Sequence, residues 1–144
     1  MNPAAKPLVT ALTYAGGLPF LACALAVVAG AKPLGLDPVA VLRAYSLVIA
    51  GFMAGAVWGV ALPHAGRGLA LIAISNVLAL AVFFAALEPS ARLSLAVDLA
   101  AFLALQAVDG FAQKRGWLTA DYLRLRIRIT ALVAASLAVA WVAA

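Results

Sequence analysis

Charged residues, histidine and cysteine are scarce in this chain. Its 144 residues include five acidic residues, one histidine and one cysteine, and only 10% of the residues are charged. An ordinary soluble domain is about 25% charged, so the composition excludes a soluble domain with a hydrated surface. The single cysteine, Cys23, excludes an internal disulfide and a cysteine-based metal site. The single histidine, His64, excludes bis-histidine haem ligation and a histidine-rich metal centre.

Catalytic motifs are missing as well. The sequence contains no phosphate-binding loop, no nucleophile with a neighbouring base and no spacing typical of metal ligands. The connections between its apolar segments are short and leave no room for a soluble catalytic module. We therefore predict a protein that is not an enzyme and that uses no cofactor.

Long apolar segments make up most of the chain. Hydrophobic residues account for 67% of the sequence, and the mean hydropathy is +1.13. Each apolar segment is close to the ~20 residues that a helix needs to cross a bilayer. The segments cover residues 8–29, 39–62, 69–87, 93–111 and 121–144. The sequence thus predicts an all-α fold, in which residues 1–144 form one integral membrane domain, a five-helix transmembrane bundle.

The first segment also resembles a secretory signal peptide. Lys6 precedes an apolar run that ends at the small residues Ala29, Gly30 and Ala31. The run is too long for a typical signal peptide, and Pro19 interrupts it. We favour a span that is not cleaved.

The basic residues predict how the bundle lies in the membrane. One end of the spans carries Lys6, Arg67, Lys114, Arg115, Arg124, Arg126 and Arg128, and the other carries Lys32, Arg43 and Arg92. The positive-inside rule then predicts a cytoplasmic N-terminus and an outside C-terminus in a bacterial inner (cytoplasmic) membrane. The net charge of +5 does not indicate nucleic-acid binding, because the basic residues lie at the ends of spans rather than on one amphipathic face.

Three glycines, Gly51, Gly55 and Gly59, recur at steps of four in the second segment. On a helix they form a groove along one face, where the backbone of another helix can approach closely. We predict that this segment is the central helix of the bundle and that the groove is a helix-packing face. The sequence leaves open whether another span of the chain or a second copy fills the groove.

Two charged residues are predicted to lie inside membrane spans, in the half nearer the outer side. Arg43 lies in the second segment and Asp98 in the fourth, and both segments begin on the outer side, so the two residues have similar depth. A charge within a span costs about 2.5–3.5 kcal/mol on insertion scales and needs an explanation. Either the two form an outer ion pair, or each reaches the interface independently.

Three arginines mark the entrance to the last span. Arg124 and Arg128 share one face of a helix, whereas Arg126 shares a nearly opposite face with Tyr122. Asp109, at the end of the fourth segment, can reach one of these arginines. Asp109 and the arginines can be interpreted in two ways: they form a buried ion pair, or they form a site for an anionic headgroup or substrate. The candidate residues for either are Tyr14, Trp58, Gln106, Asp109, Tyr122, Arg124, Arg126 and Arg128.

Short motifs occur in order along almost the whole chain. They are Leu12-Thr13-Tyr14, Gly17-Leu18-Pro19-Phe20, Gly51 to Gly55 with Trp58-Gly59, Gln106 with Asp109, Trp117, and Tyr122 to Thr130. In these motifs the chain resembles the small bacterial and mitochondrial membrane proteins similar to transmembrane protein 69, a domain of unknown function. The resemblance implies a five-helix inner-membrane protein, and the mitochondrial relatives imply a setting near the respiratory membrane. It implies no particular reaction.

Two functions fit these features. In the first, the protein is a non-catalytic accessory, structural or assembly component of a membrane complex, and its glycine groove binds other membrane subunits or a second copy. In the second, it binds or moves an amphipathic small molecule, either a quinone or an anionic lipid. The pocket for it would face the cytoplasm and be lined by Tyr14, Pro19, Trp58, Asp109, Tyr122 and Arg126. Membrane lipids are expected partners in both cases.

Overall fold

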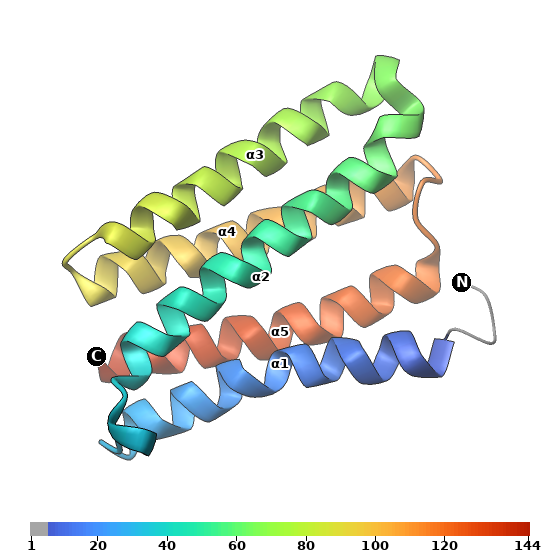
Figure 1. The fold of residues 1–144 in the computed structure, drawn as a ribbon. Coiled ribbons are helices and arrows are strands. Elements are labelled where there is room, and N and C mark those ends of the chain that lie inside the picture. Colours follow the sequence, from blue (N-terminus) through green and yellow to red (C-terminus); the bar gives the residue numbers. More distant parts are fainter. Residues whose placement is uncertain (1–5) are drawn as a thin grey trace.

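Five long helices make up the computed structural model, which describes residues 6–144 (Figure 1). They are α1 (Lys6–Val28), α2 (Pro38–Ala61), α3 (Ala65–Leu87), α4 (Ala91–Lys114) and α5 (Ala120–Ala143), with short 3-10 turns at Pro33–Gly35 and Leu62–His64. Each of the five is long and apolar enough to cross a membrane, and residues 6–144 contain no strand. The predicted five-helix transmembrane bundle is confirmed.

Local capping signals set where the helices begin. Asp37 accepts hydrogen bonds from two backbone N–H groups in the first turn of α2, and Pro38 is the first residue of that helix. Ser90 and Thr119 each accept one such bond at the starts of α4 and α5. These side chains satisfy N–H groups that have no partner within the helix. The local sequence therefore fixes the starts of α2, α4 and α5.

The helices form an antiparallel bundle with two distinct ends (Figure 1). α1 lies beside α5, α2 lies beside α3, and α4 contacts α2, α3 and α5. The start of α1 and the α2–α3 and α4–α5 connections share one end. We call this the basic end, because it carries Lys6, Arg67, Lys114, Arg115, Arg124, Arg126 and Arg128. The α1–α2 and α3–α4 connections and the C-terminus lie at the opposite end.

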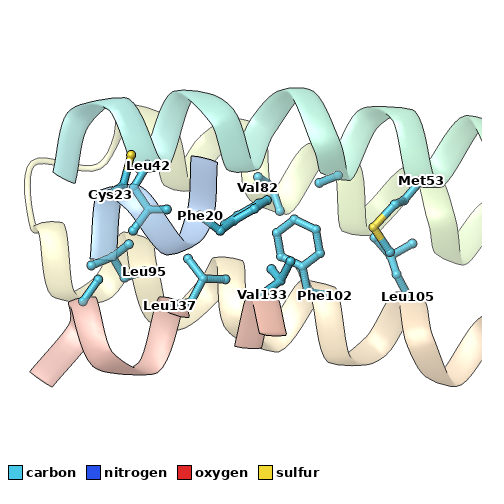
Figure 2. Close-up of a cluster of buried hydrophobic side chains, with 13 residues drawn as sticks. Phe20, Cys23, Leu42, Met53, Val82, Leu95, Phe102, Leu105, Val133 and Leu137 are labelled. Atoms are coloured by element: carbon cyan, nitrogen blue, oxygen red, sulfur yellow. The ribbon is translucent and has the colours of Figure 1, made fainter. Parts of the chain in front are cut away.

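A hydrophobic core occupies the middle of the bundle (Figure 2). Phe20 of α1 and Phe102 of α4 meet edge to face, with ring centroids 5.6 Å apart and ring planes at 90°. Leu42 of α2, Val82 of α3 and Leu137 of α5 belong to the same cluster and are fully buried. The edge-to-face geometry suits the quadrupoles of the two rings. All five helices are thus joined through one core.

The glycine face of α2 points away from this core. Gly51, Gly55 and Gly59 are exposed, and a Cβ atom added at any of them would meet nothing within 4 Å. α2 packs through its other side, where Leu42 and Met53 are buried. Of the two occupants that the sequence left open, another span within residues 6–144 does not fill the groove. The larger apolar side chains of α2 fill the core, and this leaves the glycines on the outer side.

The closest approach of two helices uses a different glycine. Gly68 of α3 lies against the backbone carbonyl of Ala61, at the end of α2, so closely that an added Cβ atom would collide with it. The 3-10 turn Leu62–His64 leads directly into α3, which begins at Ala65 and not at the predicted residue 69. The tight turn brings the two helices together immediately, so only a glycine fits at position 68.

Pro19 lies within α1, which continues through it. A proline inside a helix removes one backbone hydrogen bond and disturbs the preceding turn. In that turn, the hydroxyl of Tyr45 on α2 donates a hydrogen bond to the carbonyl oxygen of Gly16 at 2.9 Å. The carbonyl group that loses its helical partner at Pro19 is that of Ala15, four residues earlier, so the bond from Tyr45 joins α2 to the neighbouring residue of the disturbed turn.

Candidate functional site

A buried ion pair joins α4 and α5 near the basic end. Nε of Arg126 donates to Oδ2 of Asp109 at 2.8 Å, and the two side chains are only 12% and 10% exposed. The α4–α5 connection is short, so the end of α4 and the second turn of α5 lie at the same level. Of the three arginines that could reach Asp109, the structure selects Arg126.

A second polar contact lies one helical turn farther into the bundle. The hydroxyl of Thr130 donates to Oε1 of Gln106 at 3.0 Å, and Thr130 is buried. Gln106 precedes Asp109 by three residues and Thr130 follows Arg126 by four, so both contacts lie on the same facing sides of α4 and α5. Together the two contacts fix the register of these helices. Thr130 was not among the candidate site residues, although helical spacing places it on the same face of α5 as Arg126.

An apolar cavity of about 270 Å³ lies beside the ion pair. We call it the lateral cavity. Its walls come from α1, α2, α4 and α5: Leu12, Thr13, Gly16, Phe20, Ile49, Phe52, Met53, Phe102, Tyr122, Arg126, Ile129, Thr130 and Val133. Leu12 and Phe52 in this set are 63% and 75% exposed, so the cavity reaches the lipid-facing surface between α1 and α2. Figure 1 shows these two helices diverging from their connection toward the basic end.

Arg126 is the only charged side chain in the wall of the lateral cavity. A guanidinium carries five N–H donors, and the bond to Asp109 uses only the one on Nε. Arg126 makes no other hydrogen bond within residues 6–144, so donors remain for a bound molecule. Tyr122 adds a hydroxyl group to the same wall. The cavity thus combines an apolar body with hydrogen-bond donors at one end.

The other two arginines of α5 line a separate hollow between α1 and α5, which we call the basic groove. It has a volume of about 270 Å³ and is lined by Lys6, Thr10, Tyr14, Asp121, Arg124, Leu125 and Arg128. Asp121 pairs with Arg124 and lies 3.6 Å from Nζ of Lys6. The two faces of α5 therefore lead to two different environments, one buried and neutralised, the other exposed and basic.

Two residues do not belong where the sequence analysis grouped them. Tyr14 lines the basic groove and not the lateral cavity, which is lined on α1 by Thr13 and Gly16 among others. Trp58 lines neither hollow and is 41% exposed on the outer side of α2. The prediction of a single pocket lined by Tyr14, Trp58 and Arg126 is therefore wrong.

The predicted outer ion pair between Arg43 and Asp98 is also wrong. Nη2 of Arg43 donates to the carbonyl oxygens of Ala85, Ala86 and Glu88. These carbonyls lie at the C-terminal end of α3, where the carbonyl of Ala85 also accepts the backbone N–H of Glu88. The negative end of the helix dipole attracts the guanidinium. Asp98 is 1% exposed, and neither of its carboxyl oxygens has a hydrogen-bond partner in the described part of the chain.

Asp98 lies among other buried polar atoms that the sequence analysis did not single out. Ser46 on α2 and Ser94 on α4 are fully buried, and neither hydroxyl has a partner within residues 6–144. Ser46 is the hydroxyl oriented toward Asp98, although the two lack the geometry of a direct hydrogen bond. Ser94 precedes Asp98 by one helical turn, and this spacing is the sequence signal that places the two residues on the same face of α4. No group of three His, Cys, Asp or Glu side chains is arranged to hold a metal in the described residues.

The comparisons with known proteins identify a family for the chain. No curated protein and no solved structure matches it. One family model, described as "Protein of unknown function (DUF3429)", matches residues 5–142 and so covers both the lateral cavity and the basic groove. The chain therefore belongs to the DUF3429 family.

Proposed function

We propose that the protein binds a neutral amphipathic molecule in the lateral cavity, with a carbonyl-bearing head at Arg126 and an apolar tail in the lipid. The observation that supports this is a buried arginine, already paired with an acid, in the wall of an apolar cavity that opens between α1 and α2. Polar groups within a span are costly and usually functional. A quinone is one molecule of this class.

The ion pair favours a bound molecule that carries no charge. Arg126 and Asp109 together carry no net charge, and their contact is 2.8 Å long. An anionic head beside them would add an uncompensated negative charge at low dielectric, which is expensive. A neutral carbonyl or ether oxygen can accept hydrogen bonds from the free N–H groups of Arg126 at no such cost. The lateral cavity is thus better suited to a neutral molecule than to an anionic lipid.

The size of the lateral cavity supports a partly enclosed molecule. Its volume of about 270 Å³ lies near the lower end of the ~300–1,000 Å³ typical of ligand pockets. The exposed rim at Leu12 and Phe52 lets a tail continue into the bilayer. The enclosed part therefore suits the head and the first part of the tail.

Filling the lateral cavity tests this proposal. Gly16 lines it, and a Cβ atom there meets nothing within 4 Å, so Gly16→Leu should fold and occupy the cavity. We expect the variant to bind a short-tailed quinone at least about tenfold more weakly, the equivalent of ~1.4 kcal/mol, in titrations followed by native mass spectrometry. Gly55→Leu is the matched control, because position 55 is equally open but lies outside the cavity. Equal binding by wild type and Gly16→Leu would refute the proposal.

A second candidate function is the docking of a partner transmembrane helix on the outer face of α2. The outward position of Gly51, Gly55 and Gly59 favours it, since small residues let helix backbones approach in lipid. Asn76 adds support. It is exposed on α3 and makes no hydrogen bond within residues 6–144. Asn76 and Gly51 both lie about 15 Å along their helices from the basic end, so they have a similar depth.

Crosslinking tests the docking candidate. A photo-crosslinking residue at position 55 should form adducts with a second copy of the chain or with another membrane subunit. Gly51→Leu in the same protein should abolish these adducts without lowering its thermal stability, because position 51 has open space around it. A crosslinker at Leu105, which is fully buried, is the control and should react only within the chain. Adducts confined to the chain from position 55 would exclude docking at this face.

The setting in the cell is part of the same proposal. The resemblance to proteins similar to transmembrane protein 69 and the concentration of basic residues at one end support a bacterial inner membrane, with the basic end in the cytoplasm. Labelling of a single cysteine introduced at Thr119 in intact cells tests the orientation, after replacement of Cys23 by alanine. Labelling by a reagent that does not cross the membrane would reverse the assignment.

A further inference from the structure

The basic groove has an excess of positive charge that the protein does not neutralise. Three basic side chains, Lys6, Arg124 and Arg128, line it together with a single acid, Asp121. Asp121 is shared between Lys6 and Arg124. The groove therefore retains two positive charges, contributed by two helices that meet along it.

Arg128 is the least compensated of these residues. It has no carboxylate within 4 Å in residues 6–144, and its side chain is exposed. It lies eight residues into α5, or about 12 Å along the helix axis, so it is deeper in the span than Arg124. Arginine alone at this depth is costly in lipid, and arginines in spans normally have a partner. A negatively charged group from outside the protein would supply that partner.

Hydroxyl groups and an apolar track adjoin the charged part of the groove. Tyr14 brings a phenolic hydroxyl to the groove. Leu18, Leu21 and Leu25 follow Tyr14 on α1 at helical spacing and are 61%, 41% and 61% exposed. An acyl chain can lie along these leucines while its headgroup occupies the groove. This continuity distinguishes a lipid from a small anion in solution.

We infer that the basic groove binds the phosphate of an anionic membrane lipid, held by Arg124 and Arg128 with Lys6 at the entrance. Phosphate oxygens accept charge-assisted hydrogen bonds from guanidinium groups, and clusters of basic residues at the membrane surface attract anionic lipids. The site is independent of the proposed function, because the basic groove and the lateral cavity share no lining residue and the groove selects a charged group where the cavity selects a neutral one.

A lipid titration with a charge-matched control tests this inference. The purified protein, freed of bound lipid, is titrated with phosphatidylglycerol or phosphatidylcholine, and binding is followed by native mass spectrometry. We expect a preference for phosphatidylglycerol that Arg124→Gln/Arg128→Gln reduces at least about tenfold, since each basic residue contributes to anionic-lipid binding. Arg67→Gln/Lys114→Gln removes the same charge from exposed positions at the same end and should change the affinity less than about twofold.

The other outcomes overturn the inference in separate ways. Equal losses in the two double variants would mean diffuse surface attraction without a site. Displacement of phosphatidylglycerol by millimolar inorganic phosphate would identify a small-anion site instead of a lipid site. A thermal unfolding scan checks that both double variants are folded. Loss of the lipid preference together with quinone binding in Gly16→Leu would mean that the groove is not a site separate from the lateral cavity.

Discussion

Asp109→Ala is expected to destabilise the bundle by about 3–5 kcal/mol, because it leaves the guanidinium of Arg126 buried without its counter-charge. The two side chains are only 10% and 12% exposed, so water cannot readily replace the lost carboxylate. The bond also joins α4 to α5, next to the contact between Gln106 and Thr130. Reversible unfolding in mixed detergent micelles gives the free energy directly.

The exposed pair on the same helix is the control for that measurement. Asp121 contacts Arg124, but the side chains are 44% and 69% exposed. Water and salt screen an exposed pair, so Asp121→Ala should have a small effect. Asp109→Ala/Arg126→Ala should cost less than the sum of the two single changes, because it removes the unpaired charge. Similar losses for Asp109→Ala and Asp121→Ala would contradict the burial of the Arg126 pair.

Gly68→Ala is expected to destabilise the protein by about 1–3 kcal/mol or more through overpacking at the α2–α3 turn. The added methyl group would meet the backbone carbonyl of Ala61 and the Cβ atom of that residue. Backbone atoms cannot move aside as the end of a flexible side chain can, so the two helices must shift apart. The loss should appear as a lower thermal unfolding temperature of the purified protein.

Gly55→Ala is the control for Gly68→Ala and should not destabilise the protein. A Cβ atom at position 55 meets nothing within 4 Å, and alanine is favoured over glycine within a helix by about 1 kcal/mol. We expect an unchanged or slightly higher unfolding temperature for the isolated protein. If Gly55→Ala were as damaging as Gly68→Ala, the outward position of the α2 glycines would be incorrect.

The two arginine faces of α5 explain how one short segment can take part in two different sites. Arg126 is neutralised and faces the lateral cavity, whereas Arg128, two residues later, is exposed in the basic groove. In a helix, positions two residues apart point in nearly opposite directions. The alternating sequence from Tyr122 to Ile129 therefore divides its positive charges between the interior and the surface.

The amino-acid sequence by itself determined the spans and the starts of α2, α4 and α5. Continuous apolar segments of about 20 residues have few alternatives in a membrane, and Asp37, Ser90 and Thr119 cap the helices that follow them. The division of the α5 arginines between two faces also follows from helical spacing alone. The proximity of Asp109 to one of these arginines follows from the short connection between their helices.

Only the tertiary structure decided which face of each helix meets which neighbour. Spacing placed Gly51, Gly55 and Gly59 on one face but could not say whether that face turned inward, because all sides of α2 are apolar. Similar depth suggested a pair between Arg43 and Asp98, yet Arg43 donates to the carbonyl groups at the end of α3 instead. In a span that is hydrophobic all round, the sequence pattern carries little information on rotation about the helix axis, which is set by packing in the assembled bundle.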